Sequence, residues 1–174
     1  MLHPRARTIL LAELPAAEAE RLATMPTLIV DGVDGILFKD IYVLPPIRYP
    51  DGKIYIKLGE DDISPLITPS AAELNKWFKA GGSEVQGEAL KQCLLAIIPD
   101  LDAVSYHIKP CVTTAGGHHY PYLDQLDERR FVAAAGWGKS AKSSNEIGRL
   151  GALVVQEKWD DPEFSQDSFK AVYA

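Results

Sequence analysis

The stretch FVAAAGWGKSAKSSNEIG, residues Phe131–Gly148, reads as an apolar strand, a turn of small residues and the start of a helix. Ser143 is followed three positions later by Glu146, the spacing of a capping box, so we expect a helix to begin there. Such a helix start presents N–H groups without helical partners and a positive dipole end. Lys142 precedes the cap, although cations are favoured at the opposite end of a helix. An anionic ligand at this helix start would explain that lysine.

The same turn matches a dinucleotide-binding pattern, because Gly136, Gly138 and Ala141 reproduce G-x-G-x-x-[G/A] between a strand and a helix. A dinucleotide fold needs this turn to open a βαβ unit, with a second strand after the helix. Residues 158–174 are rich in Asp, Ser and Phe and show no strong strand pattern. We therefore predict a closing strand and helix, whose N-terminus can still bind an anion. A purely structural helix is the alternative.

Composition narrows the class of protein. The 174 residues are 47% hydrophobic and 24% charged, which suits one ordinary core. A net charge of −6 argues against a nucleic-acid partner, whose phosphates are bound by clustered Lys and Arg. Acidic residues interrupt the N-terminal apolar run from Glu13 onward, so we expect neither a signal peptide nor a membrane partner. With two cysteines and no disulfide framework, the sequence predicts a cytoplasmic protein with a small-molecule partner.

Hydrophobic periodicity predicts a mixed chain of strands and helices. Residues 53–59 alternate apolar and polar side chains, and Asp51-Gly52 before them is typical of a hairpin turn. An apolar helical stripe places Cys93 in the core. The expected strands are 7–14, 27–31, 35–44, 53–59, 104–114 and 131–135, and the expected helices are 15–25, 68–80, 83–98 and one from 143. We expect an α+β fold, a largely antiparallel sheet with flanking helices that ends in the strand–turn–helix.

The expected organisation has three parts. Residues 1–130 form the antiparallel sheet domain, residues 131–157 form the closing strand and helix, and residues 158–174 form a loose acidic tail. His118 and His119 are adjacent in a loop, so on an extended segment they point to opposite sides. No Asp or Glu at ligand spacing joins them, and we expect no metal site there.

Three motifs occur in a fixed order along the chain. They are YIKLG at 55–59, KPCVTT at 109–114 leading to PYLD at 121–124, and GKSAKSS at 138–144. In this order they resemble the C-terminal half of FAD-dependent amine and amino-acid oxidoreductases, the D-amino-acid-oxidase-like superfamily, in its monomeric sarcosine oxidase branch. The resemblance implies that the final strand and helix belong to a Rossmann-like FAD domain and that a flavin ring lies between the three motifs.

The resemblance also implies roles for single residues. Cys111 falls where several members attach FAD covalently through a thioether; from the strand alone it reads as a small buried side chain. Lys57 falls where the branch keeps a lysine that activates oxygen; from the strand alone it reads as part of a solvated charged face. Lys142 falls where the branch binds the substrate carboxylate. The cofactor-binding residues implied by the resemblance are Cys111, Gly136, Gly138, Lys139, Ser140, Ala141 and Lys142.

The chain also departs from the family it resembles. Trp137 stands in a turn that commonly carries a small or amide residue in the family, and the family's N-terminal phosphate cradle for FAD has no match here. We therefore expect a portion of an oxidoreductase acting on an amine or amino acid, its N-terminal half missing and inactive by itself. A second polypeptide with the dinucleotide fingerprint, or self-association, would complete it. The rival is a non-enzymatic module that binds a small molecule or partner chain with the same sheet.

Overall fold

The computed structural model describes residues 1–31, 38, 40–60 and 70–173. Contacts between Cα atoms divide these residues into two compact units. We call residues 6–60 and 70–111, as far as they are described, the sheet unit, and residues 1–5 with 112–173 the hairpin unit. The boundary predicted at residue 130 therefore falls inside the hairpin unit. Residues 35–37 and 39 of one predicted strand lie outside the described residues.

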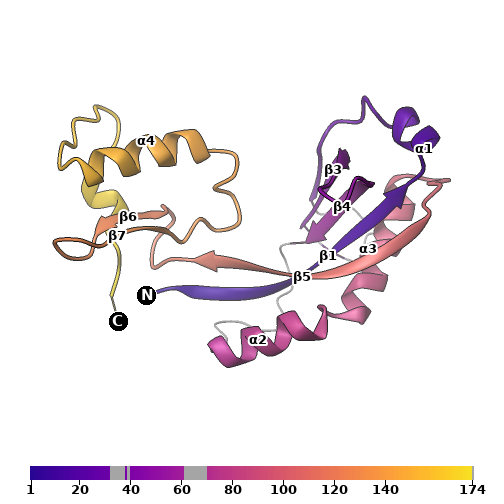
Figure 1. Cartoon of the computed structure of the whole chain (residues 1–174), viewed down its shortest axis with the longest axis horizontal. Coiled ribbons are helices and arrows are strands. Elements are labelled where there is room, and N and C mark those ends of the chain that lie inside the picture. Colours follow the sequence, from indigo (N-terminus) through magenta and orange to yellow (C-terminus); the bar gives the residue numbers. More distant parts are fainter. Residues whose placement is uncertain (32–37, 39, 61–69, 174) are drawn as a thin grey trace. The chain divides into compact units, whose positions relative to one another are not determined.

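The sheet unit is built on a five-stranded sheet with the order β2-β3-β4-β1-β5 (Figure 1). The pairs β1–β4, β2–β3 and β3–β4 are antiparallel, which confirms the predicted α+β class with its antiparallel sheet. The strands are β1 (His3–Leu14), β2 (Leu28–Asp31), β3 (Asp40–Arg48), β4 (Ile54–Glu60) and β5 (Ser105–Ala115).

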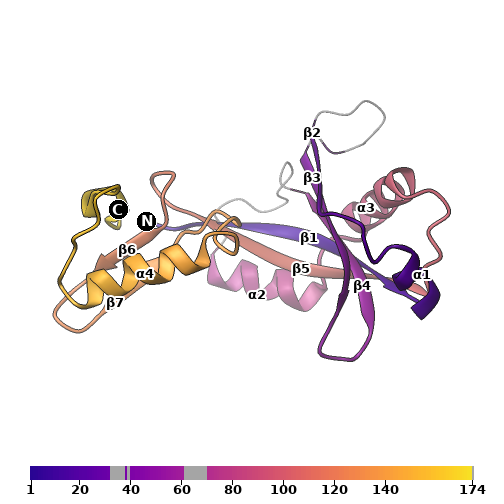
Figure 2. The same ribbon diagram turned by 90° about the horizontal axis from the view of Figure 1, so that it is seen from above.

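The hairpin between β3 and β4 is tighter than the sequence predicted (Figure 2). Residues 45–48, expected in the connection, continue β3 after a register shift between Leu44 and Ile47. Tyr49 donates its backbone N–H to the carbonyl of Lys53 at 2.9 Å, and Gly52 has φ +83. The Asp-Gly turn was thus predicted correctly, because only a residue without Cβ adopts this φ at no steric cost.

Three helices belong to the sheet unit: α1 (Ala16–Arg21), α2 (Ala71–Ala80) and α3 (Glu84–Ile97). A complete capping box between Ser70 and Glu73 starts α2, and Gly81 ends it with φ +82. Helix α3 packs its buried side chains, Cys93 included, on the sheet, as predicted. None of the described helices is long and apolar enough to cross a membrane.

Strand register gives the sheet two different faces. Leu10 pairs with Leu58 and Ala12 with Ile56, and these four side chains join the α3 core. Because side chains alternate along a strand, their neighbours point to the opposite side of the sheet. We call this opposite side the second face; the paired strands place on it Leu11, Glu13, Tyr42, Leu44, Tyr55, Lys57 and Gly59.

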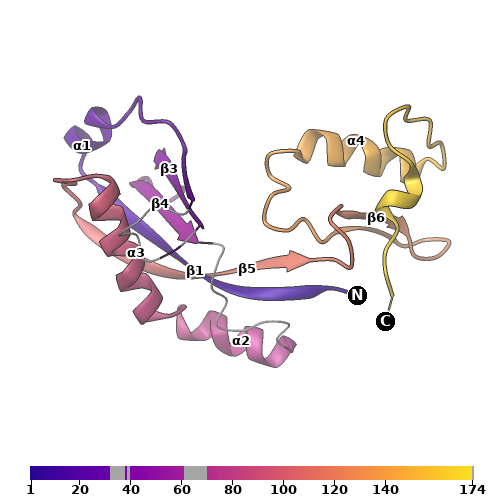
Figure 3. The same ribbon diagram turned by 180° about the vertical axis from the view of Figure 1, so that it is seen from behind.

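The hairpin unit holds a two-stranded sheet, β6 (Tyr122–Gln125) with β7 (Phe131–Ala134), and α4 (Ser144–Val155) packs on it (Figure 3). A 3-10 helix, η1 (Gln166–Phe169), follows. The expectation of a loose tail is incorrect for this segment, because Phe169 is 3% exposed among Leu123, Leu150 and Val154. Strand β6 has only four residues and was not predicted from the sequence. The described residues after α4 contain no strand, so α4 does not lead into a βαβ unit there.

Two helical glycines give a matched test of packing. A Cβ at Gly87 in α3 would overlap Cδ1 and Cγ1 of Ile108, whereas a Cβ at Gly148 in α4 would meet no heavy atom within 4 Å. We expect Gly87→Ala to lower the free energy of unfolding by about 1–3 kcal/mol through overpacking. Gly148→Ala is expected to raise it by about 0.5–1 kcal/mol, because alanine favours the helix. Urea titration measures both; equal effects would contradict the close approach of β5 to α3.

Candidate functional site

The turn after β7 has a strained backbone. Ala135 and Trp137 have φ +61 and +53, and Gly138 has φ +71. Side chains are uncommon at positive φ, and such conformations persist only where surrounding contacts hold them. Trp137 donates its backbone N–H to the carbonyl of Thr114 at 2.9 Å. A Cβ at Gly138 would lie 2.9 Å from Cγ2 of Thr113, so this glycine permits a close approach to β5. The predicted glycine turn thus lies against the end of β5.

The start of α4 differs from the prediction. Ser143 is the N-cap residue but makes no side-chain cap hydrogen bond, so the predicted capping box is wrong. Glu146 instead pairs with Arg149, which also contacts Asp161. Lys142 and Ser143 donate their backbone N–H groups to the carbonyls of Lys139 and Ser140, each at 3.2 Å. A preceding turn therefore occupies the N–H of the N-cap residue Ser143, one of the donors that were expected to be available to a ligand.

The other predicted turn residues surround this short segment. Ser140 donates its hydroxyl to the carbonyl of Gly136 at 3.1 Å, and a Cβ at Gly136 would lie 2.7 Å from Cβ of Ser140. Lys139, Ala141 and Lys142 are exposed. Gly136 is therefore required by the fold of the turn, and the two lysines can reach a ligand.

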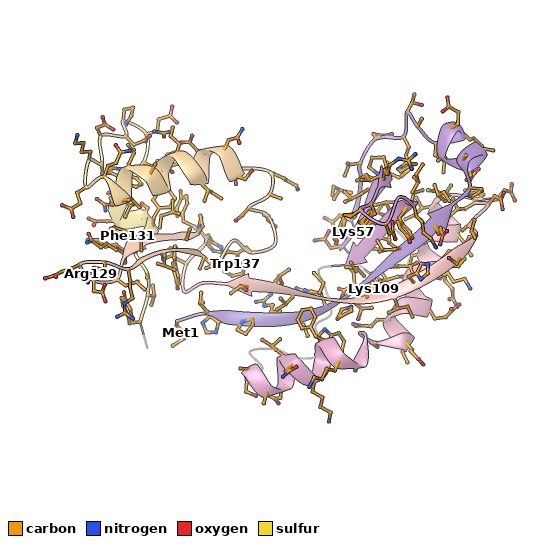
Figure 4. The ribbon with its side chains drawn as sticks, viewed as in Figure 1. Met1, Lys57, Lys109, Arg129, Phe131 and Trp137 are labelled. Carbon is orange, nitrogen blue, oxygen red and sulfur yellow. The ribbon has the colours of Figure 1, made fainter. Side chains whose placement is uncertain are left out.

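Trp137 is held by residues of the hairpin unit (Figure 4). Its indole N–H donates to the carbonyl of His118 at 3.0 Å, and its ring lies 5.8 Å from that of His119. The Arg5 guanidinium lies over the indole, 5.6 Å from its centroid. These contacts fix a bulky residue at positive φ beside Gly138, which the sequence pattern did not predict.

Cys111 lies on β5 and is partly buried. Tyr106 and Ile108 of the same strand pack against the α3 core. Alternation then places Cys111 on the second face, with Ser105 and His107. The interpretation of Cys111 as a core side chain is not supported, because it does not belong to the α3 cluster. Cys111 belongs to the sheet unit, whereas Thr113, which Gly138 approaches, belongs to the hairpin unit.

Lys57 lies in the middle of β4 on the second face (Figure 4). Its direct cross-strand neighbours are Leu11 on β1 and Leu44 on β3. Leu11 and Tyr55 are 8% and 5% exposed, so the charged strand face is not a solvated one, contrary to the reading from the strand alone. Strands β4 and β5 both flank β1, which therefore separates Lys57 from Cys111 within the sheet. Lys57 belongs to the sheet unit and the glycine turn to the hairpin unit.

A polar cluster on the second face was missed by the sequence analysis. Glu13 accepts hydrogen bonds from Lys53 at 2.8 Å and from the Ser105 hydroxyl at 3.0 Å, and Nε2 of His107 lies 3.4 Å away. The Tyr55 ring packs edge-on against His107. The hydrogen bond from Lys53 lowers the pKa of Glu13, and the same bond raises the pKa of Lys53. No local spacing signals this cluster, because Glu13 and His107 lie on two different strands, β1 and β5, and Lys53 lies just before β4.

The Glu13 carboxylate should make stability depend on pH. A lowered folded-state pKa means that its contribution is present above the unfolded value of about 4.3 and is lost as the pH falls through the folded value. We expect wild type to lose stability below about pH 4, and Glu13→Gln to lose less of it over the same interval. Urea unfolding across this range measures the difference. Glu88→Gln, at an exposed carboxylate 3.9 Å from Lys91, is the control; matching curves for all three proteins would contradict the prediction.

Comparison with known proteins places this fold among oxidases. No protein-family model matches the sequence, and no curated protein sequence matches it. Among solved structures, an Amadoriase I mutant from Aspergillus fumigatus matches with TM-score 0.64 and 14% identity over 97% of this chain and 38% of that one. A modified fructosyl peptide oxidase from Aspergillus nidulans, in complex with FSA, matches with TM-score 0.61 and 15% identity over 97% and 40%.

A third structure is the deglycating enzyme fructosamine oxidase from Aspergillus fumigatus, Amadoriase II, with TM-score 0.59 and 15% identity over 97% of this chain and 39% of that one. At such low identity the likeness defines the fold alone. The chain has the fold of part of these oxidases and spans about two fifths of their length.

Proposed function

We propose that this chain is the substrate-side and flavin-contacting portion of an FAD-dependent oxidoreductase that oxidises an amine or amino acid. The observation that carries the proposal lies within the hairpin unit: Trp137 and Gly138 of the glycine turn contact Thr114 and Thr113, the last residues of the KPCVTT motif. The fold of the solved oxidases supports it, and one of them, Amadoriase I from Aspergillus fumigatus, is a fructosyl amine:oxygen oxidoreductase, which is in line with an amine substrate and oxygen as acceptor.

The residues present fit a flavin. The backbone is strained beside Gly138, the kind of conformation that marks binding sites, and Cys111 lies outside the core where it can line or tether a ring. FAD, when bound, supplies the acceptor for a hydride from the C–H next to nitrogen. Lys142 would bind the substrate carboxylate, and Lys57 would stabilise negative charge that develops on oxygen. Lys139, Ser140 and Ala141 would lie along the flavin edge with Gly136.

The proposal includes a cytoplasmic location and a companion. Several large apolar side chains of the hairpin unit are exposed, among them Phe131 at 38%, Leu126 at 39% and Val155 at 56%. Together with a core cluster of four buried side chains, this supports completion by a second polypeptide that carries the FAD phosphate cradle, or by self-association. The same surface is compatible with a non-enzymatic partner-binding module.

Flavin content separates the two functions. We would purify the protein from its native source with any accompanying chain and record the visible flavin spectrum before and after acid precipitation. A flavin that stays with the precipitated chain supports both the oxidoreductase and the tether. A colourless protein without a companion favours the binding module.

Cysteine variants test the tether itself. We expect Cys111→Ser to release the flavin on precipitation, while Cys93→Ala, which changes the buried thiol of α3, retains it. Flavin retained by the precipitated Cys111→Ser protein would exclude attachment through this sulfur and leave a noncovalent site.

A further inference from the structure

The ammonium of Lys57 lies near an aromatic ring. Its Nζ is 5.7 Å from the centroid of the Tyr42 ring, within the range of a cation–π interaction. Tyr42 lies on β3 directly opposite Gly59 of β4, and Lys57 is therefore its diagonal cross-strand neighbour on the same face. Leu44 and Leu11 flank the lysine stem on the two adjoining strands. The side chain thus has apolar neighbours along its length and a π face at its charged end.

Gly59 makes room for this ring. A Cβ built on Gly59 would come within 2.7 Å of Cε1 of Tyr42 and closer still to Cζ and the hydroxyl oxygen. Real carbon atoms do not approach so closely, so any side chain at residue 59 would displace the ring. Residue 59 of the YIKLG motif is therefore glycine because the Tyr42 ring lies over it, and no turn or positive φ is needed to explain it.

The partner of a lysine decides whether its positive charge is neutralised, and Lys53 and Lys57 have different partners. Lys53, four residues earlier on the same chain segment, forms an ion pair with Glu13 at 2.8 Å, and the carboxylate neutralises it. Within the described part of the chain, Lys57 forms no ion pair and faces a neutral ring. A ring quadrupole attracts an ammonium group without cancelling its net charge. Lys57 is held in place while its positive field remains available to another group.

We propose that Tyr42 is a positioning residue for Lys57 and that Gly59 is glycine in order to admit the Tyr42 ring. The effect of this positioning on the reaction rests on the proposed function: the ring would hold the uncompensated ammonium of Lys57 where negative charge develops on oxygen. The arrangement itself belongs to the sheet unit alone and can be measured without a flavin.

The direct test is the NMR signal of Lys57. Lysines are reductively methylated with ¹³C-formaldehyde, which keeps their positive charge, and the Lys57 methyl signal is assigned by its absence in Lys57→Arg. We expect an upfield ring-current shift in wild type and in Tyr42→Phe, and loss of that shift in Tyr42→Leu. Gly59→Ala should also lose it, although its tyrosine is intact. The Lys53 signal reports that the second face is still folded.

The outcomes separate the inference from the function. A Lys57 signal without an upfield shift in folded wild type, or an unchanged shift in Tyr42→Leu, overturns the positioning role. In the flavin-loaded native assembly, Tyr42→Leu should slow reoxidation by oxygen about three- to tenfold and Tyr42→Phe should not, given the usual strength of a cation–π contact. If the shift behaves as expected while Lys57→Met leaves reoxidation unchanged, the positioning role stands and the proposed function of Lys57 fails.

Discussion

Phe169→Ala is expected to destabilise the hairpin unit by about 3–5 kcal/mol, the usual cost of truncating a buried phenylalanine. The Phe169 ring is 3% exposed and lies 5.2–5.8 Å from the rings of Tyr120, Trp159 and Phe164. The buried cluster of this unit has only four members, so the loss approaches the few kcal/mol that so small a core supplies.

Limited proteolysis and fluorescence measure this effect. Trp159 contacts Phe169 and donates its indole N–H to the carbonyl of Phe164 at 2.8 Å, so its emission should shift when the tail detaches. Tyr173→Ala is the matched control, since Tyr173 is 66% exposed in the same tail and its removal should change stability by less than about 0.5 kcal/mol. Equal stability of the two variants would mean that residues 158–173 are loose after all.

Glu60→Gln is expected to cost about 3–5 kcal/mol, because it removes one charge of a buried ion pair. Arg7 and Glu60 approach to 3.8 Å, and their side chains are 4% and 0% exposed. Without the carboxylate, the guanidinium would keep its charge inside the sheet unit, where desolvation is expensive.

A double replacement tests that explanation. Arg7→Met combined with Glu60→Leu removes both charges and should restore most of the loss, as apolar substitutes for buried pairs often do. Chemical denaturation of the wild type, the two single variants and the double variant completes a thermodynamic cycle. A double variant as unstable as the sum of the single variants would show that the pair does not act as a unit.

Local chemistry explains which elements the sequence predicted well. Ser70 with Glu73 starts α2 and Gly81 ends it, because the capping groups are only three residues apart and Gly81 needs no distant partner. The alternation over 53–59 predicted the faces of β4 correctly. The Ser143–Glu146 spacing is as good a capping signal, yet Glu146 binds Arg149, which Asp161 also contacts. The contact of Asp161, a residue far along the chain, with Arg149 accompanies the Glu146–Arg149 pair, and this pair replaces the cap that the local spacing predicted.

By itself, the sequence determined the helices, strands and turns that depend on neighbours within a few residues, and it identified Cys111, Lys57 and the glycine turn as candidates. Only the tertiary structure decided what those candidates touch. The Tyr42 ring lies beside Lys57 and over Gly59, and the Glu13 carboxylate contacts Lys53 and His107. Strand register brings these residues together although they are far apart in the chain. Register is set by burial of a whole face against α3, a property of the assembled sheet and not of any short segment.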